Sequence, residues 1–142
     1  MIADWIKHKP KINDGTLPVL LVDYLEMPKI AEGIWHAQMA GWGRILTYDH
    51  VQPKKARKKQ KDKKRRDNRK DGFENCDLTM DEYPFASTKE NTGSTFLTNA
   101  STKEQSKQGG QLHAFLQCHG AYTKTDGYFF FEVKVINYLI TS

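Results

Sequence analysis

The sequence predicts an α+β fold, a small single domain in which an antiparallel sheet packs against helices. Three stretches carry this prediction: a short apolar run at residues 17–25, a helix-periodic stretch at 28–41 and a β-branched and aromatic run at 127–140. Strands favour β-branched and aromatic residues, whereas apolar residues three and four positions apart mark one face of a helix. A chain of 142 residues can bury one core, so we treat residues 1–142 as a single domain.

The first fifty residues indicate an irregular segment followed by a strand, a helix and a second strand. Residues 1–16 are polar and have no regular spacing. Residues 17–25, LPVLLVDYL, form a Val- and Leu-rich run, which is typical of a buried strand. Residues 28–41 have apolar side chains at helical spacing, a proline in the first turn and a glycine at the end. Residues 44–50, RILTYDH, are predicted to form the second strand.

The last fifty residues indicate one more helix and two strands. STFLTN at residues 94–99 is a candidate short strand, and GYFFFEVKVINYLI at 127–140 is the clearest strand of the chain. Between them, residues 101–120 begin with Ser and Thr, which favour helix N-termini, and continue with apolar side chains at helical spacing. Gly109 and Gly110 lie near the expected start of this helix and cost it about 1 kcal/mol each. We therefore expect the backbone to approach another group closely there.

One segment accounts for the basic character of the chain. From Lys54 to Lys70, twelve of seventeen positions are Lys or Arg, whereas the whole chain has 22 basic and 17 acidic residues. Without this segment, 10 basic and 15 acidic residues remain, a net charge of −5. The pattern is typical of a polyanion contact made at one place, and also of a solvated linker or a localisation signal. Because like charges repel, we expect residues 52–75 to form a flexible basic loop in the absence of a polyanion.

Several classes of protein do not fit the sequence. It has no apolar run of eighteen residues, so we expect no membrane span. The N-terminus lacks the apolar centre of a signal peptide, so we expect the chain to act where it is made or to be exported as part of something larger. Cys76 and Cys118 allow one disulfide, and neither they nor the five histidines have the spacing of a metal site.

Carboxylates gather in the second half of the chain. In MDEYPFASTKE, residues 80–90, Asp81 and Glu82 stand directly before an aromatic-Pro-aromatic run, and Glu90 and Glu104 follow. A hard divalent cation takes oxygen ligands, usually one or two carboxylates with waters and phosphate. Phosphodiester hydrolysis requires such an ion and a base that activates water. From spacing alone, the commoner explanation of these acids is surface charge with solvent partners.

Two sequence blocks in a fixed order resemble a known family. DEYPFAST with Glu90 after it, and EQSKQGGQL beginning at Glu104, are similar to the core blocks of the deoxyribonuclease NucA/NucB domain, as found at the C-termini of bacterial polymorphic toxins. The resemblance extends upstream through LPVLLVDYLEMPKIAEGIWHAQMAGWGRILTYD, and it covers roughly residues 17–137. Neither block alone is specific, but the two in this order are.

The resemblance implies a metal-dependent, largely sequence-nonspecific DNA endonuclease. Its compact core would be similar to that of the ββα-metal nucleases, with an acid in place of their histidine base. On this resemblance Asp81 activates water and is also a candidate metal ligand, and Glu82 supports Asp81 or the metal. Glu104 would hold Mg²⁺ or Mn²⁺, with Gln105 nearby.

The resemblance also implies DNA contacts and supporting residues. Gln108, Gly109 and Gly110 would let the start of a helix approach the scissile phosphate, where free N–H groups favour an anion. The residues expected to support the acids are Tyr83, Pro84 and Glu90. The basic residues expected to bind DNA phosphates are Lys54, Lys55, Arg57, Lys58, Arg65, Arg66 and Arg69.

The chain departs from the family pattern at two places. Gln105 stands where members commonly have Asn, so its amide lies one methylene further out. Four residues separate Cys76 from Asp81, whereas CDEYP is common in the family, so Asp77 competes for the acid role. The distance in sequence from Asp81 to Glu104 favours Asp81, and the choice between Asp81 and Glu82 as the base stays open.

The same resemblance predicts a biological setting. The chain would be the toxin domain of a larger secreted effector that acts in the cytoplasm of a target cell. Its partners would be DNA and a cognate immunity protein with an acidic face. Two other functions fit the sequence, namely a non-catalytic nucleic-acid-binding module with structural acids and an RNase toxin. The sequence gives no indication of the oligomeric state.

Overall fold

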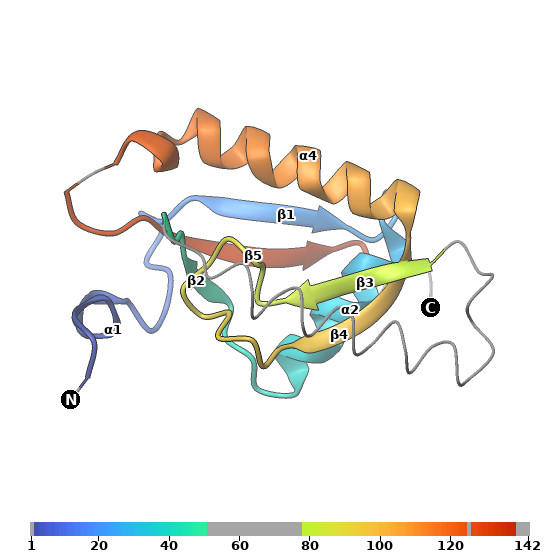
Figure 1. The fold of residues 1–142 in the computed structure, drawn as a ribbon, viewed down its shortest axis with the longest axis horizontal. Coiled ribbons are helices and arrows are strands. Elements are labelled where there is room, and N and C mark those ends of the chain that lie inside the picture. The colour runs from blue at the N-terminus through green and yellow to red at the C-terminus, as the bar shows by residue number, and fades with distance from the viewer. Residues whose placement is uncertain (1, 51–77, 125, 139–142) are drawn as a thin grey trace.

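The computed structural model describes residues 2–50, 78–124 and 126–138, and these residues form the predicted α+β fold (Figure 1). A three-stranded sheet has the order β1-β5-β2. Its strands are β1 (Val19–Asp23), β2 (Ile45–Thr47) and β5 (Phe130–Ile136). β2 and β5 are antiparallel, as expected, whereas β1 and β5 are parallel. The parallel neighbours are far apart in sequence, because parallel pairing requires a long crossover connection.

A second sheet and the helices complete the fold. The second sheet pairs two antiparallel strands, β3 (Leu78–Tyr83) and β4 (Phe96–Ser101). The helices are α1 (Asp4–His8), α2 (Pro28–Met39), α4 (Thr102–Cys118) and the short 3-10 helix η1 (Ala121–Thr123). α4 runs alongside β1, where Gln111 Nε2 donates a 2.6 Å hydrogen bond to Leu21 O (Figure 1). α2 contacts strands of both sheets and thereby joins them.

The predicted strands and helices are present within a few residues of their expected positions, and two features differ. Residues 1–16 were expected to be irregular, but they contain the short helix α1. Residues 78–83 were not predicted to be a strand, but they form β3. The two adjacent acids in β3 break the alternation of polar and apolar residues that marks a half-buried strand.

α4 begins where the Ser and Thr at its start predicted, which places its two glycines deeper in the helix than expected. Its N-cap is Ser101, whose side chain accepts a 3.1 Å hydrogen bond from Glu104 N. Gly109 and Gly110 therefore lie in the middle of the helix, where the backbone N–H groups bond within the helix and are not available to an anion. A Cβ built at either glycine would meet no atom within 4 Å, so none of the described residues makes a close approach there.

The core lies between α2 and the two sheets. Its fully buried apolar side chains are Val22, Ile30, Ala31, Ile34, Ala37, Leu46, Ala100, Ala121, Phe131 and Val133. α2 lies close to β4 at Gly33, where an added Cβ would lie 2.8 Å from Thr98 Cβ. Contacts this short do not occur between real side chains, so the packing of α2 against β4 depends on a glycine at this position.

Candidate active site

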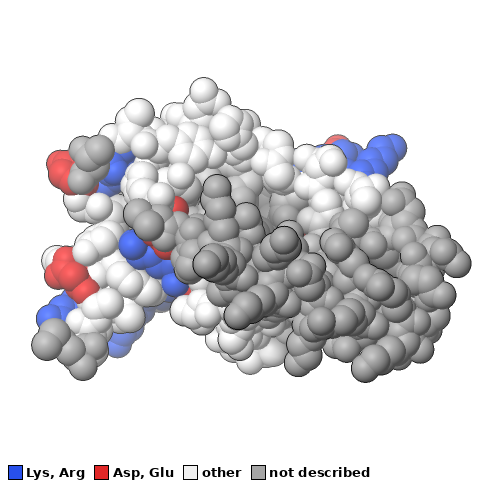
Figure 2. Space-filling model, viewed as in Figure 1, with Lys and Arg blue, Asp and Glu red and all other residues white. Residues whose placement is uncertain are grey.

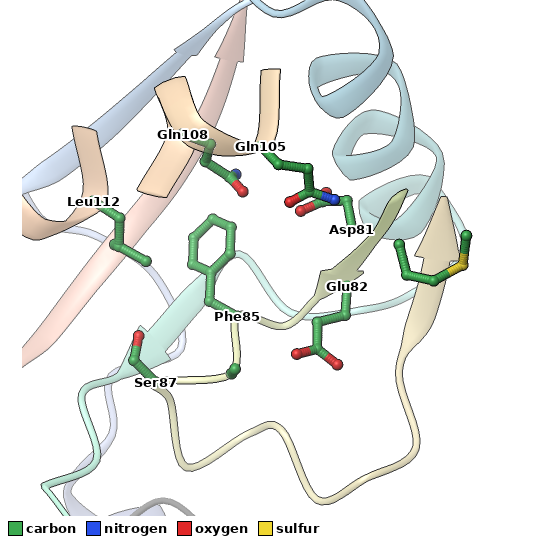
Figure 3. Close-up of a pocket in the computed structure, with 9 residues that line it drawn as sticks. Asp81, Glu82, Phe85, Ser87, Gln105, Gln108 and Leu112 are labelled. Carbon is green, nitrogen blue, oxygen red and sulfur yellow. The ribbon is translucent and has the colours of Figure 1, made fainter. Parts of the chain in front are cut away.

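A pocket of about 220 Å³ lies between β3, α4 and the loop that follows β3 (Figure 3). The residues that line it are Met80, Asp81, Glu82, Phe85, Ala86, Ser87, Gln105, Gln108 and Leu112. The sequence blocks DEYPFAST and EQSKQGGQL thus meet in space, one on the β3 side and one on the α4 side. Small-molecule and substrate sites are usually concave and combine apolar walls with a few converging polar groups, and this pocket has both.

Asp81 and Glu82 are buried on the β3 side of the pocket. Asp81 is 6 % exposed and Glu82 is 5 % exposed. Because neighbouring residues of a strand point to opposite faces, Asp81 points toward α4 whereas Glu82 points away from it (Figure 3). Surface carboxylates are rarely buried to this degree, so the explanation of these two acids as solvent-exposed surface charge is wrong.

α4 contributes one face to the pocket. Gln105, Gln108 and Leu112 are separated by three and four residues, and this spacing places them on one side of a helix. Gln105 reaches toward Asp81 (Figure 3). Gln108 is 5 % exposed, which is unusual for a glutamine on a helix that borders solvent. The pocket therefore brings two carboxylates and two carboxamides together.

The loop after β3 forms a rigid wall of the pocket. Thr88 Oγ1 and Thr88 N donate hydrogen bonds of 2.7 and 3.0 Å to Phe85 O, and Asn91 Nδ2 donates one of 3.0 Å to Pro84 O. These bonds close the chain back on itself and hold the Phe85 ring against the pocket (Figure 3). Of the aromatic-Pro-aromatic run that follows the two acids, Phe85 is the member that lines the pocket.

Tyr83 anchors the end of β3 in the core. Its hydroxyl donates to Gly43 O at 2.6 Å and accepts from Gln38 Nε2 at 3.1 Å. Burial raises the pKa of Tyr83 well above its ordinary value, because the phenolate would lose its hydration. The hydroxyl therefore remains a neutral donor, and it fixes β3 two residues after Asp81.

Glu104 and Glu90 lie outside the lining of the pocket. Glu104 Oε1 accepts hydrogen bonds from Lys29 N at 2.9 Å and Ile30 N at 3.2 Å, which are among the unpaired N–H groups of the first turn of α2. Glu90 accepts from Thr47 and Lys9 and joins β2 to the N-terminal segment. The sequence grouped Glu104 with Asp81, but the structure brings the next residue, Gln105, to the pocket instead.

Substitution of Glu104 by Ala is expected to lower the free energy of unfolding by about 1 kcal/mol, because two N–H groups of α2 lose their acceptor. Glu104→Gln keeps an acceptor oxygen and is expected to retain stability and cleavage close to wild type. Urea denaturation and a DNA cleavage assay measure both. A Glu104→Gln protein with wild-type stability and no cleavage would show instead that the charge of Glu104 acts in the reaction.

Several residues singled out from the sequence are placed elsewhere. Gly109 and Gly110 are exposed and do not line the pocket. The seven basic residues expected to bind DNA, together with Cys76 and Asp77, lie outside the described residues. Ser87 and Leu112 were not singled out, although Ser87 belongs to the DEYPFAST block and the spacing of Leu112 from Gln108 could have indicated its place.

The described residues are not basic overall. Of the 22 basic and 17 acidic residues, 12 basic and 5 acidic ones lie in residues 51–77, so the remainder of the chain has 10 and 12. On the face shown in Figure 2, the visible Lys and Arg side chains of the described residues form small separate groups, mostly on the left side and one at the upper right. In this part of the chain no three His, Cys, Asp or Glu side chains gather as a ready-made metal cluster.

Comparison with known proteins assigns the chain to a family. The model of the family Deoxyribonuclease NucA/NucB matches residues 36–128, about two thirds of the chain. The matched region includes β2, β3, β4 and α4 and every residue that lines the pocket, but it is shorter than the resemblance noted over 17–137. No curated protein matches the sequence of this chain. None of the described helices has the length and apolar character needed to cross a membrane. The chain therefore belongs to the deoxyribonuclease NucA/NucB family, which makes it a deoxyribonuclease, a hydrolase with DNA as its substrate.

Proposed function

We propose that the chain is a metal-dependent, largely sequence-nonspecific DNA endonuclease with its active site in the pocket between β3 and α4. The observation that carries this proposal is the burial of two adjacent acids at one pocket, with Asp81 facing Gln105 on α4 and Glu82 on the opposite side of β3. Taking a carboxylate out of water costs free energy even when it has partners. A site that must bind a cation and activate water gives a reason for that cost.

The residues present fit a hard divalent cation, Mg²⁺ or Mn²⁺. The donor set consists of oxygens, from the Asp81 carboxylate and the amide of Gln105, with Glu82 as a further acid in the pocket wall. Such ions are commonly held by one or two carboxylates, with waters and substrate phosphate completing the shell, so a three-acid cluster is not required. A bound ion would offset the negative charge that develops on the phosphate during cleavage.

The side chains of the pocket have separable roles in this proposal. Asp81 points toward α4, and its carboxylate accepts the proton of the attacking water. Glu82 lies on the opposite side of β3. Its negative charge supports Asp81 or the bound cation. Phe85 and Leu112 form apolar walls, which lower the local dielectric constant and strengthen the electrostatic contacts of the polar groups. The basic residues between Lys54 and Arg69 bind the DNA backbone without regard to sequence.

Removal of divalent cations is expected to abolish cleavage and leave DNA binding measurable. Supercoiled plasmid incubated with the chain should be nicked in the presence of Mg²⁺ or Mn²⁺, and the nicking should stop with a chelator. RNA of matched length, offered in the same tube, tests the RNase alternative. A chain that shifts DNA in a gel but never nicks it, with either metal, would be a binding module and would contradict the proposal.

We also propose that the domain acts as the toxin part of a larger secreted effector, in the cytoplasm of a target cell, with an immunity protein as partner. The likeness to polymorphic-toxin nuclease domains supports this setting, as does the danger of a nonspecific nuclease to the genome of its producer. Induced expression in a bacterial host should stop growth and degrade the nucleoid, and Asp81→Asn should relieve both effects. Undisturbed growth with active wild-type protein in the cytoplasm would contradict the toxin role.

A further inference from the structure

Three hydrogen-bond donors on residues that line the pocket are buried and have no hydrogen-bond partner among the described residues. They are Nε2 of Gln105, Nε2 of Gln108 and Oγ of Ser87. Two come from α4 and one from the loop after β3, so they reach the pocket from different elements. A buried donor without a partner costs about 1–3 kcal/mol of stability, and more than nine in ten buried polar groups have one. Three such atoms around one pocket indicate that they bind a ligand.

The chemistry of these atoms indicates which ligand they suit. An amide N–H and a hydroxyl both donate hydrogen bonds, so they suit an acceptor. The same pocket contains the Asp81 and Glu82 carboxylates, so a Lys or Arg placed among them would pair with the acids and lower their basicity. Neutral donors avoid this pairing and still bind anionic oxygen strongly, because hydrogen bonds to an ionised acceptor are about twice as strong as neutral ones.

We propose that Gln108 Nε2 and Ser87 Oγ form a neutral subsite for the non-bridging oxygens of the scissile phosphate. This inference rests on the proposed function and names the groups that bind its substrate. It replaces the backbone contact expected from Gly109 and Gly110, whose N–H groups bond within α4. Gln105 is kept apart from the subsite, because its amide lies beside Asp81 and is a candidate ligand of the cation.

The position of the two donors supports a shared role. Gln108 is 5 % exposed and belongs to the same face of α4 as Gln105, so a group bound by Gln108 lies next to the acids. Ser87 lies in the loop that Thr88 and Asn91 hold in place, and Ser87 O accepts a 2.8 Å hydrogen bond from Asp49 N. Both donors are thus carried by rigid parts of the fold, which lowers the entropic cost of binding a phosphate.

The chain offers matched controls for each donor. Ser87→Ala removes the pocket hydroxyl, and Thr95→Val removes another buried hydroxyl without a described partner that does not line this pocket. Gln108→Met replaces the pocket amide by a side chain of similar shape. Gln111→Met makes the same change one turn later on α4, where the amide donates to Leu21 O and borders a separate pocket.

Two measurements on these variants test the subsite, namely cleavage kinetics and the free energy of unfolding. Cleavage should fall by about ten- to a hundredfold in kcat/KM for Ser87→Ala and for Gln108→Met, and should stay within a few fold of wild type in both controls. The free energy of unfolding should stay constant or rise in the two pocket variants, because each loses an unpaired buried donor, whereas Gln111→Met should lower it. A loss of stability that accounts for the loss of cleavage would overturn the proposal.

Binding of inorganic phosphate tests the subsite independently of DNA cleavage. In the presence of a chelator, phosphate should raise the melting temperature of the wild-type protein above that in chloride of equal ionic strength, because a ligand of the native state stabilises it. Ser87→Ala and Gln108→Met should weaken this shift, and the controls should keep it. No shift in the wild-type protein, or equal shifts in all five, would overturn the subsite. A phosphate-dependent shift in a protein that never cleaves DNA would contradict the proposed nuclease and leave the subsite standing.

Discussion

Asp81→Asn is expected to lower the rate of DNA cleavage by about 10²–10⁴-fold, the usual contribution of a general base. Asn has nearly the same shape as Asp but cannot take a proton from water, and it is a weaker ligand for a hard cation. The side chain is 6 % exposed and points toward α4, so the substitution acts inside the pocket. Initial rates of plasmid nicking at saturating Mg²⁺ measure the effect.

A matched substitution shows whether the loss is specific. Asp14→Asn removes the same charge from an exposed turn, where Asp14 bonds only to Thr16 among the described residues, and it should leave cleavage unchanged. Glu82→Gln, on the opposite side of β3, decides which acid is the base. A larger loss from Glu82→Gln than from Asp81→Asn would move the base to Glu82. Wild-type cleavage by both variants would remove the site from this pocket.

Glu90→Ala is expected to destabilise the fold by about 2–4 kcal/mol, the largest effect on stability that we predict. Glu90 accepts hydrogen bonds from Thr47 N at 2.7 Å, Thr47 Oγ1 at 2.9 Å and Lys9 Nζ at 2.8 Å. Its side chain is 12 % exposed and Thr47 is fully buried, so water would not easily replace the lost acceptor. Urea denaturation monitored by tryptophan fluorescence measures the change.

A variant of one partner, Lys9, and a conservative variant of Glu90 itself divide this effect. Lys9→Met removes one donor and should cost less than Glu90→Ala, because Thr47 keeps its acceptor. Glu90→Gln keeps an acceptor oxygen, and its loss of stability should lie between those of Lys9→Met and Glu90→Ala. If Glu90→Ala unfolds like the wild-type protein but no longer cleaves DNA, Glu90 acts in the reaction and its contacts with Thr47 and Lys9 are incidental.

Some of the site was predictable because its residues are close in sequence. DEYPFAST places the acids, Phe85 and Ser87 within seven positions, and a β-strand and a loop keep such residues together whatever the rest of the fold does. The spacing of Gln105, Gln108 and Leu112 likewise follows from helical geometry alone. The order of the two blocks was enough to indicate the family, which the match over 36–128 confirms.

Other parts of the site depended on contacts between distant segments. Glu104 and Gln105 are neighbours, and a helix turns them by about 100° relative to each other. Only the packing of α4 against α2 shows that Glu104 binds the first turn of α2 while Gln105 reaches the pocket. The same applies to Glu90, whose partners Lys9 and Thr47 lie 81 and 43 positions away in the chain.

The sequence by itself determined the α+β class, the positions of most strands and helices, the family and the block that contains the acids, because these depend on local spacing and composition. The tertiary structure decided which acids are buried, which face of α4 lines the pocket and that Gly109 and Gly110 lie mid-helix. It also revealed the unpaired donors of Ser87 and Gln108. These properties are set by which surfaces pack together and which groups lose water, and local sequence patterns do not contain that information.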